Sequence, residues 1–325
     1  MVLNDISIII PNRNHAEKLK ISLAAIAQQT QKPAEVIIVD DASQDDSLAV
    51  ITGFAAANPH FTVLQNPANL GVAGAVVRGV MAAKTRYIIL ASADERLEPN
   101  MVEELMQAMA QFPEAKLGIS NYSEWYPEQG LVTVHGPDSE LGIWYMPEKK
   151  TTYVSPADLH EFLNEGHVAL QATTAIFDRQ ALIDVGIFDA DLRWIGDWFA
   201  MYALAFRHGV VVVPSSLAVF RRDPTSYSGR GMRDVAAQNT VVSYLLRKLD
   251  EPHFRYLHDA LARSPAAMSP FLRSVIRYCA LRPKHVIFTV ATMKWWSGQL
   301  LTGRRPGILR RLVHGDDHHI RSRQG

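Results

Sequence analysis

The fold is decided by the stretch "ISIIIPNRNHAEKLKISLAAIAQQTQKPAEVIIVDDASQDDS", residues 6–47. It opens with an apolar run at Ile6–Ile10, continues with a helix-like segment at about His15–Gln29, and returns to an apolar run at Val36–Val39. Such short, β-branched runs are too short for helices and predict buried strands. A strand, a helix and a second strand in this order predict a right-handed βαβ unit with parallel strands.

The same alternation continues to about residue 90. Strand-like runs follow at Phe61–Leu64 and Tyr87–Leu90, and helix-like segments lie at about Asp45–Ala57 and Gly71–Lys84. This rhythm predicts an α/β fold with a parallel sheet and helices on both faces. Ligands of open α/β sheets bind beyond the carboxyl ends of the strands, so we expect the functional site there.

Polar residues follow all four predicted strands. The strand ends read "PNRN", "DDAS", "NPANLG" and "ASADE" in chain order. The last of them contains two adjacent acids, Asp94 and Glu95. An acid at a strand end can bind a ligand, but it can equally accept hydrogen bonds from the N–H groups of a turn. For Asp94 alone, both interpretations are open.

Length and composition indicate an ordinary globular protein. The chain has 325 residues, of which 48% are hydrophobic and 20% charged, so one large domain or two smaller ones are expected and disorder is not. The single cysteine, Cys279, excludes an internal disulfide and favours a reducing compartment. No basic segment precedes the first apolar run, so we predict no signal peptide and a cytoplasmic location.

Several stretches together resemble the family 2 glycosyltransferases, whose first strand ends in a Pro-x-x-Asn loop and whose second ends in Asp-Asp-x-Ser. The stretch quoted above is similar to the opening of that family. The similarity continues through "NPANLGVAGAVVRGV" and "RYIILASADERLEPNMV", and it resumes at "IFDRQALIDVGIFDADLRWIGDWFAMYALAFRHG" and "VFRRDPTSYS". It covers roughly residues 5–230 in the family's order.

The resemblance implies a fold of the GT-A type, in which a nucleotide-binding α/β sheet is merged with an acceptor-binding half. We therefore expect a nucleotide-sugar-binding half at residues 1–120 and an acceptor-binding and catalytic half at residues 121–232. A helical, basic C-terminal extension is expected at residues 233–325.

For the donor, the resemblance implies a nucleoside-diphosphate sugar of the UDP type. Pro11 would set the direction of the chain as it leaves the first strand, because its φ is fixed, and would bring Arg13 and Asn14 to the sheet edge. Arg78 could reach the diphosphate or stay solvated. The nucleotide-binding residues expected in this way are Pro11, Arg13, Asn14, Asp41, Arg78, Ser92, Ala93 and Arg222.

Within this set, Asp41 and the arginines have specific expected roles. The family implies that Asp41 accepts the imino N–H of a uracil-type base, while Asp40 is expected to satisfy the backbone of the following turn. Arg221 and Arg222 could neutralise the diphosphate, since guanidinium groups bind phosphate in a bidentate manner.

A divalent cation, Mn²⁺ or Mg²⁺, is expected beside the diphosphate, because negative charge develops there as the sugar leaves. Such cations take oxygen ligands. The family's Asp-x-Asp motif appears here as Ser92-Ala93-Asp94, so one acid is lost. We predict Asp94 as the metal ligand, with Ser92 near the ribose or a bound water. Asp223 stands where the family commonly has His; it could also ligate the metal, or it could belong to a plain Asp-Pro turn.

The catalytic base is expected to be Asp197 in "RWIGDWFAMYALAFRHG", where the family places its base, usually as Glu-Asp. Here Gly196 replaces the first acid. A carboxylate at this point could take the proton of the acceptor hydroxyl. The alternative is a structural helix N-cap. The apolar residues Phe199, Tyr202, Leu204 and Phe206 of the same helix are predicted to face inward.

The C-terminal part is strongly basic. From Arg263 onward the sequence has twelve Lys and Arg against Asp316 and Asp317, a balance of +10, so the preceding residues carry −10. It also contains Trp295 and Trp296, but its longest apolar run is shorter than the ~20 residues needed to span a membrane. Peripheral contact with an anionic membrane, such as the inner face of the plasma membrane, and packing as a helical subdomain are both open. No nucleic acid is expected.

These features favour a metal-dependent, inverting glycosyltransferase that moves one sugar to a hydroxyl of a glycan or lipid-linked acceptor, in bacterial-type polysaccharide or glycan assembly. The Gln-x-x-Arg-Trp signature of processive synthases is absent. The alternative is a non-catalytic nucleotide-sugar-binding protein of the same fold, because both acid pairs of the family are reduced to one member. A sugar nucleotidyltransferase is disfavoured, because "PNRNHAEKL" lacks a Gly-rich phosphate loop.

Overall fold

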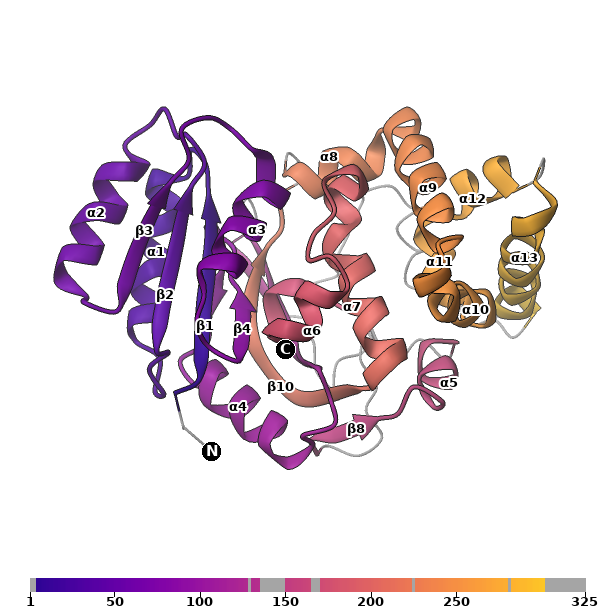
Figure 1. Cartoon of the computed structure of the whole chain (residues 1–325), viewed down its shortest axis with the longest axis horizontal. Helices are drawn as coiled ribbons and strands as arrows, with labels where there is room; N and C mark the ends of the chain where they lie inside the picture. Colours follow the sequence, from indigo (N-terminus) through magenta and orange to yellow (C-terminus); the bar gives the residue numbers. More distant parts are fainter. Residues whose placement is uncertain are drawn as a thin grey trace, which may run out of the picture.

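The computed structural model describes residues 4–127, 130–134, 150–164, 170–223, 226–279 and 282–301. Within them the chain forms one mixed sheet with the strand order β3-β2-β1-β4-β9-β6-β10-β5, while β7 pairs with β6 and β8 with β10. In Figure 1 the first strands and their helices lie at one end of the molecule, and the last helices gather at the other.

The first four strands are parallel, as the sequence predicts. They are β1 (Ile6–Asn12), β2 (Glu35–Asp40), β3 (Phe61–Gln65) and β4 (Tyr87–Leu90). The helices between them are α1 (Ala16–Ala27), α2 (Ser47–Ala57) and α3 (Gly71–Ala82). Alternate residues of β1 enter different cores: Ile8 packs in the cluster that includes residues of α1, and Ile9 in the cluster that includes residues of α3. Both faces of the sheet are therefore covered.

The second half of the sheet departs from the parallel arrangement. The strand β9 (Ala175–Asp178) runs antiparallel to both β4 and β6 (Leu117–Tyr126), while β6 and β10 (Val210–Arg221) are parallel to each other. The short strands β5 (Arg96–Leu97), β7 (Leu131–Val134) and β8 (Thr152–Val154) pair antiparallel with β10 or β6. The sheet is thus mixed, because the later strands do not follow the βαβ rhythm of the first four.

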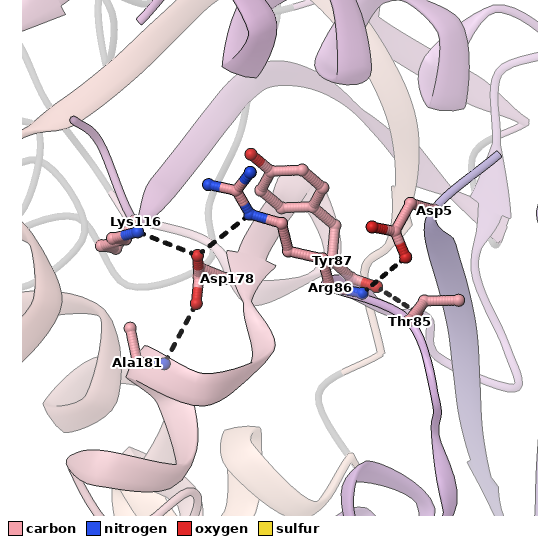
Figure 2. Close-up of polar contacts among 7 residues, drawn as sticks. All are labelled: Asp5, Thr85, Arg86, Tyr87, Lys116, Asp178 and Ala181. Atoms are coloured by element: carbon pink, nitrogen blue, oxygen red, sulfur yellow. Dashed lines mark hydrogen bonds and ion pairs between the residues drawn. The ribbon is translucent and has the colours of Figure 1, made fainter. Parts of the chain in front are cut away.

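Asp178 fastens β9 to β4 at the N-terminal end of β4, where Tyr87 pairs with it (Figure 2). Its carboxylate accepts a hydrogen bond from Lys116 Nζ at 3.0 Å, lies 3.5 Å from Arg86 Nε, and accepts from the N–H of Ala181 at 3.2 Å. Burial alone would raise the pKa of Asp178, but these hydrogen bonds and charges outweigh it and lower the pKa. This ion cluster stabilises the end of the sheet opposite the predicted site.

Four more helices belong to the second half of the sheet: α4 (Met101–Gln111), α5 (Leu159–Asn164), α6 (Arg179–Asp184) and α7 (Gly196–His208). The inward positions predicted for α7 are all buried, at Phe199, Tyr202, Leu204 and Phe206. A 3₁₀ helix at Ala190–Ile195, η3, leads into α7.

The described part of the C-terminal extension, residues 233–279 and 282–301, is helical, and it packs on the rest of the chain (Figure 1). The helix α8 (Tyr227–Arg233) leads into it, and its helices are α9 (Val235–Leu249), α10 (Arg255–Arg263), α11 (Pro265–Met268), α12 (Leu272–Cys279) and α13 (Val286–Leu301). Leu245, Val275 and Phe288 share one hydrophobic core with α7 and the sheet. The expected boundary at residue 233 therefore does not separate two cores.

No helix among the described residues is long and apolar enough to cross a bilayer. The last six Lys and Arg of the basic tail, from Arg304 onward, lie outside the described residues. The same holds for parts of the expected acceptor half, at residues 128–129, 135–149, 165–169 and 224–225.

Candidate active site

The loops after β1 and β2 are tied together at the carboxyl edge of the sheet. Asn12 Nδ2 donates to Asp40 Oδ1 at 3.1 Å, and Asn14 Oδ1 accepts from the N–H of Gln44 at 2.7 Å. Asn14 and Ala42 have positive φ angles of 57° and 55°, a conformation that non-glycine residues adopt at a cost. Backbone strain in both loops is typical of a functional edge.

Asn12, which the sequence analysis did not select, is 2% exposed. Its Oδ1 has no hydrogen-bond partner among the described residues. A buried amide oxygen without a partner is costly, and it is suited to accept an N–H from a ligand. Of the selected neighbours, Pro11 lies within β1 and Arg13 is exposed.

Both acids after β2 hold loops in place. Asp40 Oδ2 accepts from the N–H of Ser43 at 3.1 Å, which is the structural role expected for it. Asp41 Oδ1 accepts from Asn66 Nδ2 at 2.7 Å and from Leu70 N at 2.8 Å, and its Oδ2 accepts from Gly71 N at 2.9 Å. Asp41 thus fixes the loop that leads into α3. A nucleotide base that binds to Asp41 would have to share the carboxylate oxygens with Asn66, Leu70 and Gly71.

Arg78 joins this network and is not simply solvated. Its guanidinium donates to the carbonyl of Gln65 at 2.7 Å and to the side-chain oxygen of Asn66. Asn66 in turn donates to Asp41. Arg78 therefore supports the loop around Asp41, a role that neither interpretation of its sequence position included.

Asp94 and Asp223, the two predicted metal ligands, both lie near the same lysine. The ammonium of Lys18 on α1 is 3.7 Å from Asp94 Oδ2 and 3.6 Å from Asp223 Oδ2. Ser92 Oγ donates to Asp94 Oδ1 at 2.5 Å. The Ala93 side chain is 2% exposed and packs in the core, so only its backbone is available to a nucleotide. Lys18 was not selected from the sequence.

Glu95 is a third residue near the edge that was not selected from the sequence as a site residue. It is 8% exposed, and its Oε2 has no hydrogen-bond partner among the described residues. Burial raises the pKa of Glu95 to about 8. A hydrogen bond from Thr173 opposes this rise, and the negative charges of Asp94 and Asp197 add to it. Asp94, Asp197 and Arg222 therefore all lie within electrostatic reach of one buried carboxyl.

Asp197 is the second residue of α7, and Ile195 is the N-cap, so the N-cap interpretation of Asp197 is wrong. Its Oδ1 accepts from the N–H of Trp198 at 2.7 Å. Neighbouring protein atoms desolvate the carboxylate and raise the pKa of Asp197 to about 6, although backbone hydrogen bonds to the carboxylate lower it in part. Just before α7, Arg193 has φ 48° and ψ −120°, a strained conformation of the kind found at functional sites.

The arginines at the end of β10 are held by aromatic and acidic neighbours. Arg222 forms an ion pair with the buried Glu124, and its backbone N–H donates to the carbonyl of Trp125 at 2.8 Å. The guanidinium of Arg221 lies 4.8 Å from the centroid of the Trp125 ring. Arg222 lies near the carboxyl edge of the sheet, since its positive charge lowers the pKa of Glu95.

The oxygen ligands at Asp94 and Asp223 suit a hard divalent cation, because two carboxylates from different loops meet at one cationic group. A separate group of possible ligands, Asp250, His258 and His285, has ligand atoms within 4.8 Å of one another. It lies on the C-terminal helices and shares no residue with the predicted cation site.

Residues 7–149 match the model of Glycosyl transferase family 2. The uncharacterized glycosyltransferase YibD of Escherichia coli strain K12 is 33% identical over 103 residues, which are 32% of this chain and 30% of YibD. The glycosyltransferase GlyG of Streptococcus pneumoniae is 31% identical over 125 residues, 38% of this chain and 41% of GlyG. The chain therefore spans less than half the length of these relatives.

Two solved structures share the architecture over nearly the whole chain. Residues 1–349 of S. aureus TarS, in complex with UDP-GlcNAc, superpose with a TM-score of 0.55 at 14% identity and cover 92% of each chain. The mannosyltransferase PcManGT from Pyrobaculum calidifontis, in complex with GDP-Man and Mn²⁺, has a TM-score of 0.56 at 15% identity and covers 96% of this chain and 88% of its own. At this identity the likeness shows the fold, which is the GT-A type.

Proposed function

Since residues 7–149 match the model of Glycosyl transferase family 2, we propose that the chain is an inverting glycosyltransferase that moves one sugar from a nucleoside-diphosphate sugar to an acceptor hydroxyl. The observation that carries this proposal is the convergence of acids at the carboxyl edge of the sheet. Asp94 and Asp223 contact one ammonium, and the charges of Asp94 and Asp197 both act on the buried Glu95. Carboxylates with separated pKa values in one site are typical of acid–base catalysis.

Asp197 is the proposed base. With a pKa of about 6 it is mostly ionised at neutral pH, and it is basic enough to accept a proton in the transition state. Glu95, with a pKa of about 8, stays protonated at neutral pH, which leaves Asp197 as the negatively charged one of the two acids. In a single displacement the acceptor oxygen bonds to the anomeric carbon, its proton goes to Asp197, and the bond to the diphosphate breaks. One displacement inverts the anomeric configuration.

Asp94 and Asp223 would hold a divalent cation, Mn²⁺ or Mg²⁺, through carboxylate oxygens. When bound, such a cation stabilises the negative charge on the leaving diphosphate. The mannosyltransferase PcManGT was solved with Mn²⁺, which supports this choice of metal. We propose a UDP-type donor, which is supported by the UDP-GlcNAc complex of TarS.

A panel of UDP- and GDP-sugars tests the proposed function directly. We expect calorimetry to detect binding of at least one nucleotide sugar, and a coupled assay to detect slow release of nucleoside diphosphate without an acceptor. Release distinguishes a transferase from the alternative, a binding protein of the same fold. If a folded sample bound no UDP- or GDP-sugar, with or without Mn²⁺, the proposed function would be wrong.

The exposed face of α13 supports a peripheral membrane location. Among the side chains of α13 that the structure describes, the exposed large apolar residues are Val286, Ile287, Val290 and Met293. The opposite face is buried at Phe288 and Thr292, and Trp295 Nε1 donates to the carbonyl of Asn164 at 3.2 Å. The basic residues Arg282, Lys284 and Lys294 are exposed nearby in sequence. We propose that this apolar face enters an anionic membrane surface, such as the inner face of the plasma membrane, and brings the site to a lipid-linked acceptor.

The double substitution Ile287→Asp with Met293→Asp should abolish sedimentation with anionic vesicles at low salt. Both side chains are at least half exposed, at 50% and 55%, so the melting temperature should change little. Met81→Asp is the matched control, because Met81 is equally exposed, at 57%, on α3. Undiminished sedimentation of the double variant would exclude the membrane proposal. Truncation at residue 263 is unsuited to this test, because it would remove Val275 and Phe288 from the shared core.

A further inference from the structure

One lysine ammonium lies within ion-pair distance of both carboxylates proposed as cation ligands. The ammonium of Lys18 is 3.7 Å from Asp94 Oδ2 and 3.6 Å from Asp223 Oδ2. The acids come from the loops after β4 and β10, whereas Lys18 comes from α1. A divalent cation held by both acids would compete with this ammonium for the same oxygens.

The ion pairs are not needed to fasten α1 to the sheet. Ser22 Oγ, one turn further along α1, donates to the carbonyl of Ser92 at 3.0 Å. At the start of the helix, the N–H of Ala16 donates to Asp45 Oδ2 at 3.0 Å. The buried face of α1 adds Leu19 and Leu23 to the core. A structural role alone therefore does not explain why a lysine stands at position 18.

Charge gives a more specific explanation. Asp94 and Asp223 alone would place two negative charges at the edge where a diphosphate anion binds in the proposed function. Lys18 offsets one of them and so reduces the repulsion of an anion. The same positive charge opposes the binding of a second cation at these acids.

We propose that Lys18 is a built-in counterion of the donor site. The chain then binds a nucleoside diphosphate without a divalent cation, and Mn²⁺ or Mg²⁺ binds at Asp94 and Asp223 by displacing the Lys18 ammonium. This inference rests on the proposed function, because it assigns the diphosphate of the donor to this edge of the sheet.

Lys18→Met tests the proposal, since methionine keeps the apolar stem of the side chain and removes its charge. We expect two opposite effects on the full chain: UDP binding in EDTA should weaken about tenfold, and Mn²⁺ binding without nucleotide should tighten about tenfold, because two part-exposed ion pairs are lost. Calorimetry measures the first and the electron paramagnetic resonance of unbound Mn²⁺ the second. Lys18→Arg keeps the charge and should behave like the parent in both.

Lys20→Met is the matched control. Lys20 lies on the same helix, is exposed, and pairs with Glu17 at 2.7 Å, so its loss removes the same charge without touching the two acids. The proposal is overturned if Lys18→Met and Lys20→Met have the same affinities for UDP and Mn²⁺, or if the parent binds UDP only with Mn²⁺ present. Failure of the proposed function looks different, because then no folded variant binds UDP or GDP under any condition.

Discussion

Asp197→Asn is expected to lower the rate of sugar transfer by about 10²–10⁴, with little change in donor affinity or melting temperature. Asparagine cannot accept the proton of the acceptor hydroxyl. Its side-chain oxygen can still accept the hydrogen bond from the N–H of Trp198, which Asp197 Oδ1 accepts at 2.7 Å, so the start of α7 should keep its shape. Single-turnover transfer, donor calorimetry and thermal melting on one sample measure the three quantities.

The pH dependence of transfer gives an independent check on Asp197. A general base acts in its ionised form, so the parent's rate should fall as the pH decreases through about 6, the pKa that burial gives Asp197. The residual rate of Asp197→Asn should lack this dependence. Asp191→Asn, an exposed acid in η3, serves as the control and should transfer normally. A stable Asp197→Asn variant with near-normal transfer would remove the base assignment.

The first half of the fold could be predicted because its information is local. The strands Ile6–Asn12 and Tyr87–Leu90 are buried apolar runs, and the segments between them have helical length and composition. The order of the later strands could not be predicted. The strand β9, Ala175–Asp178, lies between β4 and β6 in an antiparallel direction, and this arrangement depends on pairing between residues far apart in the chain.

Site residues could be predicted where an acid lies in the loop after a strand. They could not be predicted where contacts between distant segments bring a residue to the site. Asp94 and Asp223 were selected, and the structure brings them together at Lys18. Lys18 was missed because a lysine on an amphipathic helix usually faces solvent. Glu95 was missed because a residue on a turn gives no local sign of burial, yet it is 8% exposed. Sequence spacing alone could not distinguish the partly buried Asp94 from the buried Glu95.

Asp94→Ala is expected to remove the increase in donor affinity that Mn²⁺ produces, a loss of at least about tenfold if it resembles the effect of removing groups that support a metal site. UDP binding in EDTA should not weaken, because the substitution removes a negative charge from the edge that binds the anion. Calorimetry with UDP, in EDTA and in saturating Mn²⁺, separates the two effects. Misfolding would weaken both, and Asp46→Ala, an exposed acid before α2, should change neither.

Glu95 cannot take over the role of Asp94 in this variant, although it is the next residue. Burial raises the pKa of Glu95 to about 8, so at neutral pH it is a protonated acid and a poor cation ligand. Removal of Asp94 would lower that pKa, because the charge of Asp94 contributes to the rise, but the burial that dominates it would remain. Asp223 would then be the one remaining partner of Lys18 in the cation site that we propose. Full Mn²⁺ dependence in Asp94→Ala would therefore exclude Asp94 as a metal ligand and place the cation elsewhere on the chain.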